Sequence, residues 1–189
     1  CHDDSRAMNK MAAISDQHSM EINQQSLSAA IAMVRLHLEH HLCRVTGRQI
    51  SDDSAGQLLA ARERCAEIST SASPPPALET LCALFGLSLF ERDVLLFCAG
   101  MELDAAFASS AAVAHGDPQR PYPTFGLALA ALPQPLWNAL LPTAPLRYWH
   151  LIEFGQSSGS TGAPLTTRPI RIDEKILHYL TGIQHLDER

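Results

Sequence analysis

Apolar residues recur at three- and four-residue steps along much of the chain, which is the spacing of one face of an α-helix. The first such run spans residues 27–45 and is followed by Gly47, a residue type that commonly ends a helix. Its apolar positions are Leu27, Ile31, Val34, Leu38, Leu42 and Val45. A second helix is predicted from the N-cap candidates at 51–54 to about Ile68. Its apolar face is Leu58, Ala61, Cys65 and Ile68.

The pattern changes on both sides of these two helices. Residues 1–25 are polar with scattered methionines and predict a flexible leader. Residues 69–76 contain three consecutive prolines, which cannot continue a helix and predict a stiff linker. The chain therefore divides into a leader (1–25), an N-terminal helical segment with a Pro-rich linker (26–76), and a helical, winged-helix-like domain (77–189).

The third part begins with a short predicted helix over 77–84 that stops at Gly86. Ser88 and Glu91 have the spacing of a capping box at the start of the next helix. This helix is apolar nearly all round, so we expect it at the centre of the core. Its apolar residues include Phe90, Val94, Leu95, Phe97 and Cys98. Further helices are predicted at about 102–114, 124–131 and 134–141.

Two neighbouring strands are predicted after these helices. Residues 147–154 are aromatic and β-branched, and 163–172 form a weaker strand that Pro169 confines to an edge or a bulge. Asp173 then caps a last helix, which ends at Gly182. A β-hairpin after a run of helices is the wing pattern of a winged-helix domain. The predicted fold class is therefore mainly α, with a helical bundle followed by a winged-helix-like unit carrying one β-hairpin.

Charge and cysteine content bear on which partners and compartment the protein has. The formal net charge is −6, which disfavours nucleic-acid binding because contacts with phosphates need clustered Lys and Arg. The five cysteines are odd in number and include no C-x-x-C pair, which predicts free thiols in a reducing compartment. No apolar run approaches the length of about 18 residues that a membrane span needs. We expect a cytoplasmic protein without a membrane partner.

The glycine- and serine-rich stretch FGQSSGSTGAPLT, residues 154–166, raises the question of a phosphate-binding loop. A P-loop needs G-x-x-x-x-G-K-[ST], in which the lysine reaches the phosphates. Position 160 is serine, the nearest lysine is Lys175, and the stretch joins two predicted strands rather than a strand and a helix. We therefore interpret it as a flexible wing tip, and we expect this chain to hold no cofactor.

Other titratable clusters favour structural roles. His37 and His41 lie one helical turn apart beside His40, but no third zinc ligand follows, so a solvated helix face is the favoured interpretation. Glu91 is accounted for by capping, and Asp93 and Asp104 can pair with arginines, of which Arg92 and Arg120 are candidates. No catalytic or metal-binding residue is predicted, and a stand-alone enzyme has no supporting arrangement of residues.

The segment before the hairpin bears on DNA binding, because a winged helix usually carries a basic recognition helix there, here called the reading helix. That segment here is PQPLWNALL, without a lysine or arginine. Cations near the hairpin are Arg147, Arg168 and Arg171, which are the candidate partner-binding residues. They can meet either phosphates or an acidic protein surface. We expect a protein partner, and a DNA-binding winged-helix regulator remains the alternative.

Three collinear motifs carry a resemblance to a known family. They are LFGLSLFERDVLLFCAGMELD (84–104), GDPQRPYPTFGLALA (116–130), and PLRYWHLIEFG with PLTTRPIRIDEKILHYLTGIQHLDER (145–189). Together they resemble the winged-helix-containing N-terminal region of a group of bacterial AAA+ ATPases, some of which accompany contractile, phage-tail-like injection systems. The resemblance covers slightly more than half of the chain, and residues 1–76 match only loosely.

The resemblance implies a role as a docking domain. In these ATPases the ATP- and Mg-binding residues lie towards the C-terminus, beyond the segment that resembles this chain, so no catalytic residue carries over. The implied whole protein is a cytoplasmic, hexameric machine that remodels protein assemblies. The implied partners of this chain are a protein partner or substrate and the rest of its own ATPase chain.

Overall fold

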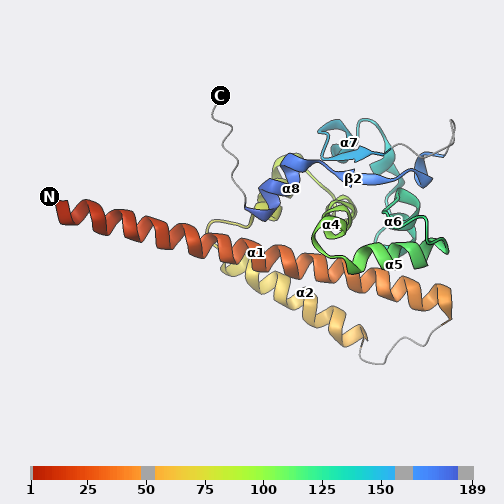
Figure 1. Cartoon of the computed structure of the whole chain (residues 1–189), viewed down its shortest axis with the longest axis horizontal. Coiled ribbons are helices and arrows are strands. Elements are labelled where there is room, and N and C mark those ends of the chain that lie inside the picture. The colour runs from red at the N-terminus through yellow and green to blue at the C-terminus, as the bar shows by residue number, and fades with distance from the viewer. Residues whose placement is uncertain (1, 48–53, 156–163, 183–189) are drawn as a thin grey trace.

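The computed structural model describes residues 2–47, 54–155 and 164–182 (Figure 1). The fold is mainly α with a small antiparallel hairpin, as the sequence predicted. A long helix, α1 (His2–Thr46), lies along one side of the molecule, and α2 (Ser54–Ser71) runs back beside it. The remaining elements pack on the other side of α1, with α4 (Leu89–Leu103) in the middle.

Helix α1 runs from His2 through the predicted end of the leader at residue 25 without a break. Asn23, inside the expected leader, connects α1 to two other parts of the fold. Its Nδ2 donates to the Leu180 carbonyl at 2.9 Å, and its Oδ1 accepts from the Ala77 amide at 2.8 Å. The described side chains of this segment, residues 17–25, are mostly exposed, in keeping with their polar composition. Past Thr46, Gly47 adopts the expected left-handed conformation with φ of 67°.

The start of α4 forms as its sequence specifies. Helix α3 (Ala77–Phe85) ends at Gly86, whose φ is 64°. Ser88 and Glu91 then make the predicted capping box, in which the serine side chain accepts from the Glu91 amide and the glutamate accepts from the Ser88 amide at 3.0 Å. Both orphan amides of the first turn are thereby satisfied.

Helix α4 is the centre of the core, as predicted. The apolar residues named for it are all buried: Phe90, Val94, Leu95, Phe97 and Cys98. They pack with the inner face of α1 and with the hairpin in one continuous cluster. Burial on all sides explains why this helix has no polar face.

The boundary between α4 and the next helix lies later than predicted. Glu102 and Leu103 belong to α4, and α5 begins only at Ala106 and ends at His115. Asp104 separates the two helices in an extended conformation, and its Oδ1 accepts from the Ala106 amide at 2.9 Å. A hydrogen bond between an aspartate side chain and a nearby backbone amide competes with the hydrogen bonds that would continue the helix, which explains the break.

The segment before the hairpin differs most from the prediction. Helix α6 (Phe125–Ala131) forms where expected, with Thr124 as its N-cap. The helix predicted over 134–141 is reduced to one 3₁₀ turn, η1 (Trp137–Leu140). A four-residue helix, α7 (Pro145–Tyr148), replaces the first half of the predicted strand 147–154. Prolines explain both changes, because several lie between 133 and 145 and proline fits the first turn of a helix but not its interior.

The hairpin is shorter than the sequence predicted. Strand β1 (Ile152–Phe154) pairs antiparallel with β2 (Ile170–Ile172), and the 3₁₀ turn η2 (Leu165–Thr167) precedes β2. Residues 156–163, the centre of the predicted wing tip, lie outside the described residues. Helix α8 (Glu174–Thr181) follows, capped by Asp173 and ended by Gly182 as expected.

A third segment extends this small sheet. Thr124 forms an antiparallel bridge with Pro169, and the Ile170 amide donates to the Pro123 carbonyl at 3.0 Å. Pro169 therefore lies where the sheet is only bridged, which fits a residue without an N–H. The bridged segment before α6 and the two-stranded hairpin together resemble the sheet of a winged helix.

Candidate docking surface

Of the three candidate arginines, Arg147 is occupied inside the fold. Its Nη1 donates to the Leu140 carbonyl at 2.5 Å, and its guanidinium carbon lies 5.1 Å from the centre of the Phe154 ring. These contacts join η1 to α7 and α7 to β1. Arg147 therefore holds the segment before the hairpin in place through contacts inside the fold.

The other two arginines lie on or beside β2. Arg171 is exposed and stands opposite Glu153 in the strand register, so a carboxylate accompanies it on the outer face of the hairpin. Arg168 is half-buried just before β2. The three arginines therefore have different neighbours and do not share one environment. Their role in partner binding stays a prediction.

The position of a reading helix is occupied by η1 and α7. Neither is longer than four residues, and Leu141 between them is extended. A reading helix presents several side chains along one face to the major groove, which needs more than one continuous turn. This segment cannot present such a face.

Aromatic side chains are exposed at this position instead. Trp137 is 66% exposed, Tyr148 59% and Trp149 52%, and Leu141 beside them is also exposed. We call these four residues the aromatic patch. The Tyr148 and Trp149 rings meet edge-on with centroids 4.9 Å apart. Exposed tryptophan and tyrosine are the side chains most often found at the energetic centre of protein interfaces.

The patch continues onto the corner between α3 and α4. The ring of Trp149 lies 5.5 Å from that of Phe85, which is close to two further exposed leucines in the chain, Leu84 and Leu89. The sequence between residues 132 and 152 contains no aspartate or glutamate, although the whole chain is acidic. The segment that carries the patch therefore contributes no acidic group to this surface.

Sequence reasoning found only part of this surface. Trp137 and Leu141 belong to the segment whose lack of cations was noted, but Tyr148 and Trp149 were assigned to a strand. In a strand, consecutive side chains point to opposite faces, whereas here both are exposed. Pro145 was the available signal, because proline favours the first turn of a helix.

A buried ion cluster lies between α3 and α4. Arg92 pairs with Glu79 at 3.3 Å and with Asp93 at 3.5 Å, as the sequence suggested for Asp93. Burial raises the pKa of Asp93 to about 6, and the positive charge of Arg92 opposes this shift. Asp104 instead pairs with Arg35 of α1 at 3.2 Å. The Arg92–Glu79 pair joins α4 to α3, and the Arg35–Asp104 pair joins α1 to the end of α4, whereas Arg92 and Asp93 both belong to α4. These contacts assign no chemistry to the carboxylates.

His37 and His41, which were considered as zinc ligands, are partly buried, which corrects their assignment to a solvated face. Burial lowers the pKa of His37, and His40 adds to the effect. Burial also lowers the pKa of His41, which contacts the backbone of Ala130 in α6. Within the described residues, no three His, Cys, Asp or Glu side chains converge as metal ligands would.

The cysteines that the structure describes are free thiols. Cys98 is fully buried, and Cys43, Cys65 and Cys82 are half-buried. Burial raises the pKa of Cys82 to about 11. A protonated thiol is a weak nucleophile, so Cys82 is unsuited to covalent chemistry at neutral pH.

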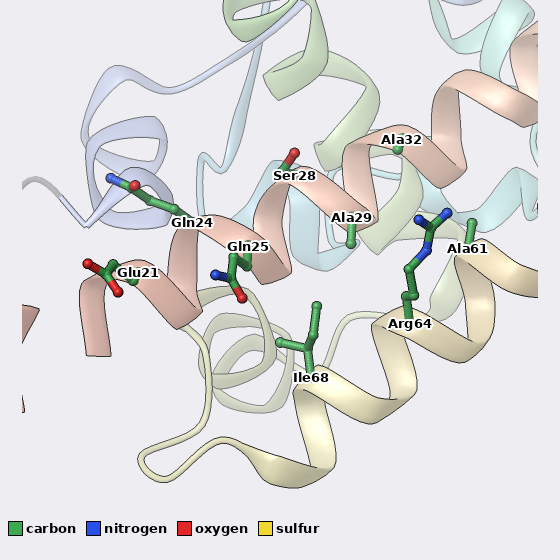
Figure 2. Close-up of a pocket in the computed structure, with 9 residues that line it drawn as sticks. All are labelled: Glu21, Gln24, Gln25, Ser28, Ala29, Ala32, Ala61, Arg64 and Ile68. Carbon is green, nitrogen blue, oxygen red and sulfur yellow. The ribbon is translucent and has the colours of Figure 1, made fainter. Parts of the chain in front are cut away.

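A groove of about 560 Å³ lies between α1 and α2 (Figure 2). Its floor is formed by small side chains, including Ala29 and Ala61, and Ile68 points into it from α2. Glu21 lies at one end and Arg64 towards the other. Its lining residues include no cluster of nucleophilic or metal-binding side chains.

The family assignment follows from comparison with known domains. The winged helix domain, variant family matches residues 7–189, which is nearly the whole chain. The chain belongs to this family. The match begins inside the expected leader, in agreement with the continuity of α1. No curated protein and no solved structure matches the chain.

The described helices were also compared with the length and hydropathy of a membrane span. None of them alone meets both requirements. Helices α4 and α5 meet them only as a pair, and the two are bent by 118° at their junction.

Proposed function

We propose that this winged-helix chain docks a protein and forms the N-terminal part of a AAA+ ATPase. The observation that carries the docking role is the aromatic patch at the position of a reading helix. DNA binding needs cations aimed at phosphates and side chains that reach base edges. The patch offers neither, while exposed aromatic side chains fit an apolar protein surface.

The ATPase part of the proposal is supported by the three motifs of the resemblance. They coincide with the elements that build the winged helix: the α3–α4 corner, the segment from Gly116 through α6, and the hairpin with α8. In the proposed protein, ATP and Mg bind a separate C-terminal module, the assembly is hexameric, and its location is the cytoplasm. The winged helix brings a partner or substrate to that motor.

The docking role is tested by two exposed substitutions, Trp137→Ser and Tyr148→Ser, made together in the full-length protein. The matched control is Val113→Ser, which changes an exposed apolar residue of α5 outside the patch. Cross-linking and mass spectrometry in native cells identify what the unaltered protein contacts. We expect the patch variant to lose a partner that the control keeps. If the patch variant and the control recover the same amount of every partner, docking through the patch is contradicted.

The alternative function is tested by titrating the chain with a labelled DNA duplex at near-physiological salt. We expect a Kd no tighter than the non-specific range of about 10⁻⁴–10⁻⁶ M. A sub-micromolar Kd would instead favour a DNA-binding regulator over a protein-docking domain. The ATPase part is tested separately by the coding sequence downstream, where we expect G-x-x-x-x-G-K-[ST]; its absence would overturn that part alone.

A further inference from the structure

The outward face of α1 forms a ridge between two grooves. Gln24, Ser28 and Ala32 line the groove towards α2, of about 560 Å³ (Figure 2). The same three residues line a second groove of about 500 Å³, which is bounded by the end of α4 and by α8. Spaced four residues apart, they form one row along the helix. We call this row the α1 ridge.

The shape of this surface is complementary to another helix. Helices pack when a row of side chains on one lies in the groove beside a row on the other, at axial separations of about 8–10 Å. Serine and alanine on the ridge permit approach at the short end of that range. Apolar side chains line both grooves, Ile68 in the first and Leu27, Ile31 and Leu103 in the second.

Charged side chains stand at both ends of the ridge. Glu21 is exposed at its N-terminal end. Arg35 lies at its C-terminal end, and Arg64 of α2 is exposed in the same direction along the groove. Arg35 already contacts Asp104 and Glu39, but a guanidinium carries five N–H donors and this one is about two-fifths exposed.

We infer that the α1 ridge binds the α1 ridge of a second copy of this chain, antiparallel, about a two-fold axis at Ser28. Glu21 and Arg35 lie seven residues on either side of Ser28, so the symmetry brings each glutamate opposite the other copy's arginine. Gln24 and Ala32 lie four residues on either side and meet in the same way. A two-fold contact of this kind is self-complementary, as isologous interfaces require.

A parallel arrangement is disfavoured by the same charges. It would place Glu21 against Glu21 and Arg35 against Arg35 along the contact. The antiparallel contact goes beyond the proposed docking function, because it uses α1 and leaves the aromatic patch accessible. The two can therefore be tested independently.

The association is tested by sedimentation velocity over about 1–100 μM chain, the range of a moderate self-association. We expect a species of twice the 20.6 kDa chain mass to appear as concentration rises. Ser28→Glu puts two carboxylates at the axis and is expected to give monomer. The control Ser109→Glu makes the same change at an exposed site on α5 and is expected to leave the dimer intact.

The orientation is tested by disulfide cross-linking with Gln17→Cys and Glu39→Cys, which alter exposed residues eleven positions on either side of Ser28. In an antiparallel dimer the two variants cross-link when mixed, whereas each alone shows only the background of the parent chain. Cross-linking of each variant alone would indicate a parallel dimer and overturn the inference. A monomer throughout the range, or a dimer lost with Trp137→Ser but kept with Ser28→Glu, would also overturn it.

Discussion

The ring of Phe107 lies directly over Gly100, where α5 crosses the end of α4. A Cβ atom added at Gly100 would come within 2.7 Å of the ring, closer than real side-chain contacts allow. Phe107 is fully buried and also contacts Phe97, with ring centroids 6.1 Å apart. The glycine is therefore required for the close approach of the two helices rather than for an unusual backbone conformation.

Gly100→Ala is expected to destabilise the fold by about 1–3 kcal/mol, because the added methyl overpacks the core. An exposed helix would instead gain about 1 kcal/mol from this change. The free energy of unfolding from urea titration measures the effect. Gly100→Ala combined with Phe107→Leu should recover part of the loss, since the flat ring is gone. If Gly100→Ala alone were more stable than the parent, the Phe107 ring would have to move aside without cost.

Asn23→Leu is expected to lower the free energy of unfolding by about 1–3 kcal/mol. The change leaves the Leu180 carbonyl and the Ala77 amide without their side-chain partner. Asn138→Leu, the same change at an exposed asparagine of η1, is the matched control with little expected effect. If both variants unfold at the same urea concentration, Asn23 does not anchor α1.

Asp93→Asn is expected to change how stability depends on pH. The pKa of Asp93 is raised to about 6 in the folded state from 3.8, so at pH 7 the buried charge disfavours folding. Lowering the pH towards 5 lets the folded state bind a proton and removes part of this cost in the parent alone.

The variant should therefore be more stable than the parent at pH 7, and its advantage should shrink by about 1 kcal/mol at pH 5. Chemical denaturation of both proteins at the two pH values measures this difference. Comparing the pair cancels the opposing contributions of His37 and His41, whose pKa values are lowered. A constant difference across pH would mean that Asp93 keeps an ordinary pKa.

Millimolar ATP with Mg is expected to leave the melting temperature of this chain unchanged, because its sequence contains no P-loop. A ligand present at a hundred times its Kd would stabilise the fold by about 2.7 kcal/mol. Differential scanning fluorimetry with and without nucleotide is sufficient to detect such a shift. A reproducible increase would assign a nucleotide site to the winged helix itself.

The elements that the sequence predicted well are those with local signals. Ser88 and Glu91 specify the start of α4 through their own hydrogen bonds, and Gly86 and Gly182 end helices by adopting positive φ. The burial of α4 followed from its uniformly apolar composition. None of these features depends on residues far away in the chain.

The errors came from contacts between distant segments. Asn23 connects α1 to residues 77 and 180, and no local pattern reveals these contacts. The aromatic patch was missed in part because Tyr148 and Trp149 suit a strand by composition but are held in and beside α7 by Arg147 and its neighbours. The candidate arginines were identified by charge alone, and their surroundings required the folded structure.

The position of Thr124 makes the hairpin and the helices one mechanical unit. Its backbone is bridged to Pro169 beside β2, while its side chain caps α6 through the Leu127 amide at 3.1 Å. Helix α6 in turn packs against α1. Strand β2 also packs against α4, and η2 packs against α6. A force applied to the hairpin is therefore shared among several contacts before it reaches α1.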